Sequence, residues 1–337
     1  MRRSLPQRHC RPMDEFERIA KLYAPLAAGF EGALGLKDDA AVISMAPGED
    51  LVVTADALVA EVHFLPEDAP GLIARKALRC NLSDLAAKGA TPFAYLQTTA
   101  LPREWGDDWL GEYAAGLALD QREFGVHLIG GDSTETPGPA TISITAFGRV
   151  AQSTAIRRAG AGVGDRVFVS GTLGDAALGL MAIYGRIAGL MAPDRAFLVD
   201  RYRLPQPRVS LGPRLVGIAR SAVDVSDGAV ADLGHVCEVS GVGAVLDFGR
   251  VPLSAAAAAA LGRSADLLAP ILTGGDDYEI LFTAPPACAG AIAAIAQEIG
   301  IPITEIGYII EGHGVQVRDG AGRIVELART GYRHFRG

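Results

Sequence analysis

The residues best suited to chemistry lie between Ser221 and Leu233, in the stretch SAVDVSDGAVADL. An apolar run leads into Asp224 and Asp227 and a helical pattern follows, which predicts a strand, an acidic turn and a helix. Carboxylates at the carboxyl end of a strand lie where an α/β sheet opens its ligand crevice. Two such carboxylates repel unless a cation lies between them, and Mg²⁺ carrying phosphates suits their oxygens. The simpler alternative is that Ser226 or Asp227 only caps the helix.

Similar acidic positions recur in both halves of the chain, and most of them follow a strand or a glycine. These are Asp39, Asp56, Asp84, Asp132 and Asp276. Thr54 lies two residues before Asp56 and therefore shares its side of an extended strand. A carboxylate set without His or Cys indicates Mg²⁺ or Mn²⁺ and not zinc. We expect these acids to converge in a cleft between two domains, where ligands usually bind.

Three further features suit phosphate groups. Gly130 and Gly131 precede Asp132 and offer backbone N–H groups at close approach. Arg158 stands in a polar connector and matches phosphate geometry, although a solvated linker charge is the plainer reading. Neither a P-loop nor a protein-kinase catalytic loop is present in the sequence. Together the residues predict metal-assisted phosphoryl transfer of another design.

The elements that must position these residues follow from hydrophobic periodicity. We predict helices at 13–28, 71–90, 105–125, 229–236, 255–260 and 291–299, and strands at 40–43, 51–56, 93–101, 126–129, 141–150, 166–170, 222–223, 279–283, 303–310 and 314–318. The segment 130–134 reads as a turn, but the long polar insert before residue 141 excludes a tight hairpin.

Length and composition set the frame for these elements. At 337 residues the chain predicts two domains. We expect a flexible tail at 1–12, one domain at 13–150 and a second at 151–337. The net charge of −8 argues against a nucleic-acid surface. No signal peptide or membrane span is evident. The cysteines are far apart, which predicts no zinc site or disulfide framework and fits the cytoplasm: Cys10, Cys80, Cys237 and Cys288.

Six segments in this order and spacing resemble the thiamine-monophosphate kinase family. They are GLKDDAAV, TADALVAEVHF, NLSDLAAKGA, GGDST, VDVSDG and GGDDYEILFT. That family belongs to the ATP-binding superfamily of aminoimidazole ribonucleotide synthetase and selenophosphate synthetase. The resemblance implies a two-domain, PurM-like α/β (α+β) fold whose N-terminal domains form a homodimer. It also implies direct in-line transfer of the ATP γ-phosphate to thiamine monophosphate, the final step of thiamine diphosphate biosynthesis.

The resemblance also assigns roles to individual residues. The Mg²⁺ ligands that it implies are Asp39, Thr54, Asp56, Asp84, Asp132, Asp224 and Asp227. The ATP contacts that it implies are Gly131, Asp132, Arg158 and Ser226. The substrate contacts that it implies are His63, Asp276 and Tyr332. A carboxylate suits the thiazolium cation, and Tyr332 suits stacking on a substrate ring.

Three positions depart from the family pattern. Lys37 replaces the usual Gly before the paired aspartates, Ala55 replaces a Thr or Ser, and Asp276 replaces the usual Glu. Two rival functions share the acidic framework: a sister synthetase of the selenophosphate or aminoimidazole ribonucleotide type, and a non-catalytic nucleotide-binding maturation protein. Cys10 lies in the tail and does not match the reactive residue of selenophosphate synthetases.

Overall fold

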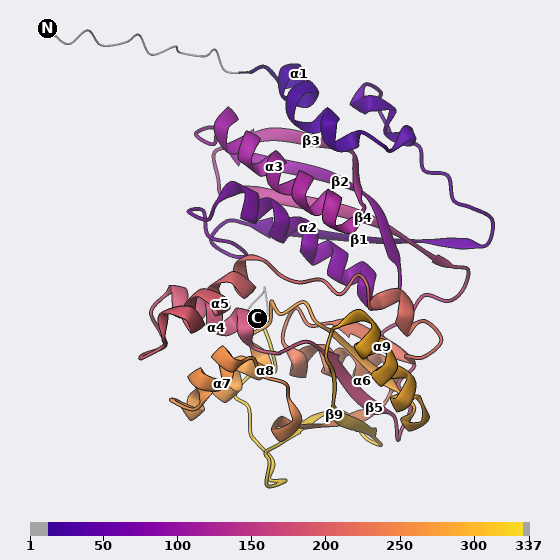
Figure 1. Cartoon of the computed structure of the whole chain (residues 1–337), viewed down its shortest axis with the longest axis vertical. Coiled ribbons are helices and arrows are strands. Elements are labelled where there is room, and N and C mark those ends of the chain that lie inside the picture. The colour runs from indigo at the N-terminus through magenta and orange to yellow at the C-terminus, as the bar shows by residue number, and fades with distance from the viewer. Residues whose placement is uncertain (1–12, 333–337) are drawn as a thin grey trace, which may run out of the picture.

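The computed structural model describes residues 13–332, and the predicted tail at 1–12 lies outside the described residues. Two β-sheets lie one below the other along the long axis, each with its own helices (Figure 1). The strands are β1 (Glu49–Val59), β2 (Thr91–Pro102), β3 (His127–Thr136), β4 (Thr141–Ala151), β5 (Arg166–Ser170), β6 (Ser221–Asp224), β7 (Gly243–Asp247), β8 (Ile280–Ala284), β9 (Ile303–Ile310) and β10 (Gly314–Arg318).

The helices fall between these strands, so the chain mixes α and β elements throughout. They are α1 (Glu15–Arg18), α2 (Pro70–Ala87), α3 (Asp107–Phe124), α4 (Asp175–Ile183), α5 (Ala192–Arg203), α6 (Ala229–Ser240), α7 (Ala255–Leu261), α8 (Leu268–Thr273) and α9 (Ala289–Ile299). Among the described residues, no helix is both long enough and apolar enough to cross a bilayer.

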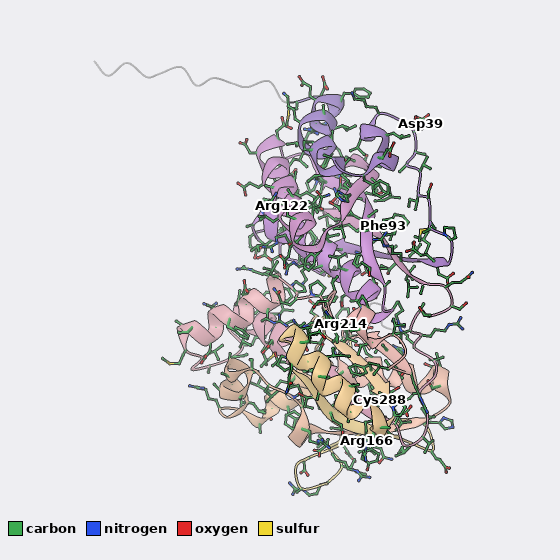
Figure 2. All side chains as sticks on the ribbon, turned by 45° about the vertical axis from the view of Figure 1, so that its right-hand side comes forward. Asp39, Phe93, Arg122, Arg166, Arg214 and Cys288 are labelled. Atoms are coloured by element: carbon green, nitrogen blue, oxygen red, sulfur yellow. The ribbon has the colours of Figure 1, made fainter. Side chains whose placement is uncertain are left out.

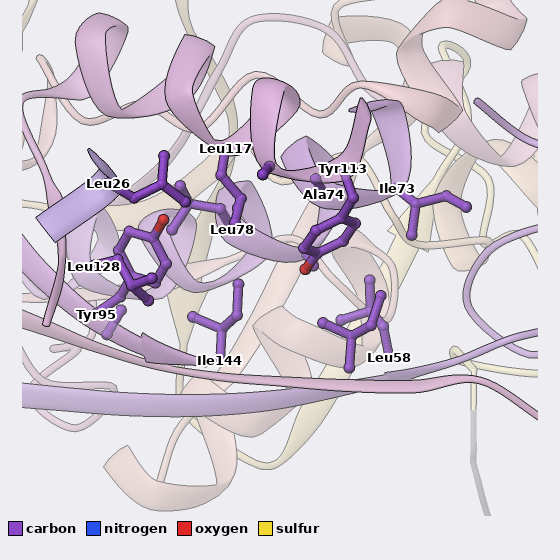
Figure 3. Close-up of a cluster of buried hydrophobic side chains, with 14 of the residues drawn as sticks. Leu26, Leu58, Ile73, Ala74, Leu78, Tyr95, Tyr113, Leu117, Leu128 and Ile144 are labelled. Carbon is purple, nitrogen blue, oxygen red and sulfur yellow. The ribbon is translucent and has the colours of Figure 1, made fainter. Parts of the chain in front are cut away.

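The first sheet has the order β1-β4-β2-β3, and helices α2 and α3 cover one of its faces (Figure 1). Leu58 and Ile144 point from the strands toward Leu78 of α2 and Leu117 of α3 in one buried cluster (Figure 3). Each such side chain contributes about 1.5–3 kcal/mol when it is fully buried. A slip of one residue would turn these side chains to the other face, so the core fixes the register of the strands.

The opposite face of this sheet is only partly covered. On β1 the alternate residues Leu51 and Val53 are 41% and 53% exposed. Toward β3 the segment 27–43 packs over the face through Phe30 and Ile43. The first sheet therefore has one open apolar end, at β1, and one covered end, at β3.

The second sheet has the order β10-β7-β9-β5-β8-β6. Helix α2 contacts both β1 of the first sheet and β6 of the second. The carboxyl end of β6 is Asp224, and α6 begins five residues later. The first acidic motif of the sequence thus lies at the junction between the two sheets.

The fold class and most elements are those that the sequence predicts, with three corrections. Residues 40–43 form no strand, because Val42 donates its N–H to the carbonyl oxygen of Gly32 in the same segment while Ala41 and Ile43 pack against the first sheet. The predicted turn at 130–134 is part of β3, which pairs with β2 as far as Thr136. Gly131 is required there, since a Cβ would lie 1.8 Å from the carbonyl oxygen of Gln97. The predicted helix at 13–28 is divided into α1 and two short helical turns.

Candidate active site at the domain junction

Helix α2 brings together three of the predicted metal ligands. Thr54 Oγ1 donates a hydrogen bond to Asp84 Oδ2 at 2.5 Å. The backbone N–H of Asp56 donates to Asn81 Oδ1 at 3.1 Å, which ties β1 to the same helix. Thr54 and Asp56 pair with Ala146 and Ile144, which are both buried, so the two side chains lie on one side of their strand, as their spacing predicts.

Asp224 adds a carboxylate from the second sheet. Its side chain is buried, and this burial, followed by the charges of Asp84 and Asp232, raises its pKa. The pKa of Asp56 rises to about 6 because of burial and the charge of Asp84. Carboxylates from both domains thus repel one another in a poorly solvated place. We call Asp56, Asp84, Asp224 and Asp227 the junction acids.

The turn that carries Asp227 is held by a residue that sequence reasoning missed. Asp232 Oδ2 accepts hydrogen bonds of 3.1 Å from the backbone N–H groups of Ser226, Asp227 and Gly228. Burial and the charge of Asp227 raise the pKa of Asp232 to about 7. An acid in the first turn of a helix that follows a Ser-Asp-Gly segment is the signal that could have identified it.

Two cations lie beside the junction acids. Lys88 Nζ donates to the carbonyl oxygen of Ala222 at 2.8 Å. Burial, together with the positive charge of Arg158, lowers the pKa of Lys88 to about 8, while Asp224 and Asp84 oppose that shift. Lys88 lies one helical turn after Asp84, a spacing that sequence reasoning did not use. The predicted phosphate contact Arg158 is exposed and therefore accessible to a ligand.

The predicted substrate contacts also lie close to the junction. The backbone N–H of Tyr332 donates to the carbonyl oxygen of Asp227 at 3.1 Å, and the Tyr332 side chain is 48% exposed. His63 Nδ1 accepts from the backbone N–H of Val59 at 3.0 Å. Asp276 Oδ2 lies 3.0 Å from Nζ of Lys76 on α2.

Asp39 and Asp132 lie elsewhere, and we call them the β3-edge acids. Together with Gly131 they line a cavity of about 810 Å³ between β3 and the segment 33–43. Figure 2 shows Asp39 at the end of the first domain that is remote from Arg166 and Cys288 of the second. This arrangement differs from the expected single cluster in an interdomain cleft.

The register of the first sheet explains the separation. Asp56 on β1 pairs with Ile144, whose side chain is buried on the helix-covered face. Asp132 on β3 pairs with Thr98, whose side chain is exposed. The two acids are on the opposite edge strands, three strand spacings or roughly 14 Å apart along the sheet. Within one chain the structure does not bring them together.

The junction acids fit a hard divalent cation. Their carboxylate oxygens, with the hydroxyl of Thr54, are the donors that Mg²⁺ prefers. Burial and neighbouring carboxylates raise the pKa of Asp56 and Asp224, as expected in a place where positive charge is needed. Among residues 13–332, no three His, Cys, Asp or Glu side chains are already arranged as a metal-binding group. The donor set therefore suits an ion that is shared with phosphate oxygens, since Mg²⁺ seldom uses an all-protein cage.

Comparisons with known proteins agree with this architecture. Residues 37–150 match the family description "AIR synthase related protein, N-terminal domain", and residues 162–320 match "AIR synthase related protein, C-terminal domain". These matches define the class: a two-domain, PurM-like α/β protein.

More specific relatives lie within that class. A thiamine-monophosphate kinase of Caulobacter vibrioides is 44% identical over 96% of this chain and 91% of its own length. The crystal structure of the same kinase from Stenotrophomonas maltophilia is 42% identical, with a TM-score of 0.78 over 84% of this chain and 89% of that one. The structure of AaThiL complexed with AMPPCP and TMP is 29% identical, with a TM-score of 0.76 over 88% and 91%. The chain therefore belongs to the thiamine-monophosphate kinase family.

Proposed function

We propose that this protein transfers the γ-phosphate of ATP in line to thiamine monophosphate. The product is thiamine diphosphate, and the reaction is the final step of thiamine diphosphate biosynthesis. The observation that carries the proposal is the full-length similarity to thiamine-monophosphate kinases, including AaThiL with its bound AMPPCP and TMP. The grouping of Asp56, Asp84 and Asp224 beside Arg158 supports it independently, because it provides ligands for metal and a cation for phosphate.

We assign the residues of the site as follows. The junction acids, Thr54 and the β3-edge acids hold several Mg²⁺ ions, which when bound neutralise charge on the phosphates. ATP is held by Gly131, Asp132, Arg158 and Ser226, and thiamine monophosphate by His63, Asp276 and Tyr332. The acceptor is a phosphate that is already ionised at neutral pH, so no side chain has to remove a proton. Catalysis then consists of positioning and electrostatic stabilisation.

We also propose a homodimer formed through the first sheet. The exposed Leu51 and Val53 on its open face support such packing. The β3-edge acids and the junction acids lie at opposite edges of that sheet. Pairing β1 of one copy with β3 of the other would bring the edges that carry the two groups side by side and satisfy both exposed edges. Light scattering should give twice the mass of one chain, and a monomeric mass at assay concentrations would contradict the proposal.

We assign the protein to the cytoplasm. Cys80, Cys237 and Cys288 are all free thiols, which suits a reducing compartment. ATP and thiamine monophosphate are the proposed small-molecule partners.

The deciding experiment uses the purified protein with ATP, Mg²⁺ and one acceptor at a time. Formation of thiamine diphosphate from thiamine monophosphate is the expected result. Formation of selenophosphate or aminoimidazole ribonucleotide would instead identify a sister synthetase. ATP binding without turnover of any acceptor would identify a nucleotide-binding maturation protein.

A further inference from the structure

A buried lysine, Lys76, lies at the domain junction and belongs to none of the groups assigned to metal, ATP or acceptor. Lys76 is on the inner side of α2 and is only 2% exposed. Lysine is almost never buried to this degree unless a partner neutralises it. Its neighbours on the helix, Ile73 and Ala77, belong to the apolar core, so a solvated role is excluded.

The partners of Lys76 come from the other domain. Its Nζ lies 3.0 Å from Asp276 Oδ2 and 3.7 Å from the centroid of the Tyr202 ring. Burial alone would lower the pKa of Lys76, but the charge of Asp276 and the contact with Tyr202 raise it overall. Lys76 is therefore an ammonium ion held between a carboxylate and an aromatic face.

These contacts connect two of the proposed substrate residues. Tyr202 Oη donates to the carbonyl oxygen of His63 at 3.4 Å. The connection therefore runs from His63 through Tyr202 and Lys76 to Asp276, and each of its three contacts crosses between the domains. His63 and Asp276 are 213 residues apart in the sequence (276 − 63), yet one buried cation links them.

Asp276 is fixed from two sides. Its backbone has the left-handed φ of 64°, and its N–H donates to the carbonyl oxygen of Ser226 at 2.9 Å. Tyr278, with φ of 52°, likewise donates its N–H to the carbonyl oxygen of Val225 at 2.8 Å. Such backbone strain persists only where the surroundings enforce it, and it is often found at functional sites. The Asp276 side chain keeps 32% of its surface exposed, so it can still meet a ligand.

We propose that Lys76 is a positioning residue that holds the Asp276 carboxylate toward the cationic ring of the phosphate acceptor. The inference rests on the proposed function and extends it. Lys76 engages Oδ2 of Asp276, while Oδ1, among the described residues, accepts only a long hydrogen bond of 3.4 Å from Tyr278 Oη. Oδ1 is therefore the oxygen that we assign to the acceptor, whose thiazolium ring carries the matching charge. In this proposal Lys76 acts on the acceptor through Asp276 and not on ATP.

The test compares Lys76→Met with the unchanged protein. Methionine is one heavy atom shorter than lysine, keeps an unbranched apolar stem and removes the charge, so the α2 core stays nearly filled. We expect the KM for thiamine monophosphate to rise about tenfold or more, the loss typical of one charge-assisted hydrogen bond. The KM for ATP should stay within about twofold, since Lys76 acts only on the acceptor. Calorimetric titration with thiamine monophosphate alone should show the same weakening.

Two further variants separate positioning from a structural role. Lys76→Met added to Asp276→Asn should weaken acceptor binding no further than Asp276→Asn alone, because both act through one carboxylate. Lys76→Gln provides the same comparison should the Met variant fail to fold. Equal rises in both KM values, or an unchanged KM for the acceptor, would show that Lys76 only joins the domains. If the protein without substitutions neither binds nor phosphorylates thiamine monophosphate, the proposed function is refuted, and this inference with it.

Discussion

The junction acids and the β3-edge acids differ in how the fold holds them. Asp56, Asp84 and Asp224 are fixed by a strand, a helix and a strand end, and burial raises the pKa of Asp56 and Asp224. Asp39 and Asp132 lie on an exposed loop and an edge strand, around an open cavity. One half of the proposed site is therefore assembled within a single chain, whereas the β3-edge half lies apart from it in the same chain.

Removal of a junction acid should have the largest effect. Asp227→Asn should lower kcat about 10³-fold or more, because a metal ligand contributes several kcal/mol of charge stabilisation to the transition state. The folded structure should persist, since Asp227 is only half-buried. Steady-state kinetics and a thermal melt test both points, with Asp266→Asn as the control on an exposed acid. Retained turnover would overturn the metal assignment.

Mixing two inactive variants should show whether the two groups of acids serve one site. Asp227→Asn and Asp132→Asn, unfolded together and refolded, should recover about a quarter of the normal activity if each site of a two-fold dimer combines both chains. In such mixed dimers one site carries both substitutions and the other carries neither. If the mixture stays as inactive as its components, each chain must complete its own site by moving Asp132.

The pH dependence of the free energy of unfolding should further distinguish the junction acids from the β3-edge acids. The pKa of Asp56, about 6 in the folded protein, exceeds its unfolded value of about 3.9. The folded state then holds a proton that the unfolded chain has lost, so metal-free protein should lose stability as pH rises from about 4 to about 6. Melting in EDTA across this range tests the expectation. Asp56→Asn should reduce the slope, while Asp224 and Asp232, whose pKa values are also raised, keep part of it. An unchanged profile would contradict the role of the Asp56 carboxyl group.

Lys37 should give the smallest effect. It follows the left-handed residues Leu34 to Leu36 but has a φ of −116°, so its own backbone does not require the family's usual glycine. If its charge assists phosphate binding at the β3 edge, Lys37→Ala should raise the KM for ATP about two- to fivefold, the range for an exposed charge. Lys37→Gly should behave alike, and unchanged ATP affinity in both variants would leave Lys37 without that role.

Local patterns in the sequence predict the junction well because its residues stand beside well-marked elements. The period-2 pattern around Thr54 and Asp56 and the helical pattern around Asp84 fix the faces of β1 and α2 before any contact is known. The structure of the β3 edge is harder to predict from local patterns in the sequence. Gly130 and Gly131 look like a turn, and only pairing with Gln97 on β2 shows that they continue a strand.

The roles of buried charged residues are also hard to predict from the sequence. Lys76 and Asp232 lie among apolar residues, and their partners are supplied by other elements or by backbone N–H groups. Only the folded chain shows those partners, so residue type and spacing alone assigned neither residue a role.

The Asp232 carboxylate has a consequence for how nucleotide is received. By accepting hydrogen bonds from the N–H groups of Ser226, Asp227 and Gly228, it fixes the shape of this turn from within the chain. An incoming phosphate then meets a preformed turn and need not spend binding energy on ordering it. The same carboxylate excludes phosphate from those three donors, so the proposed nucleotide site relies on metal ions and Arg158 instead.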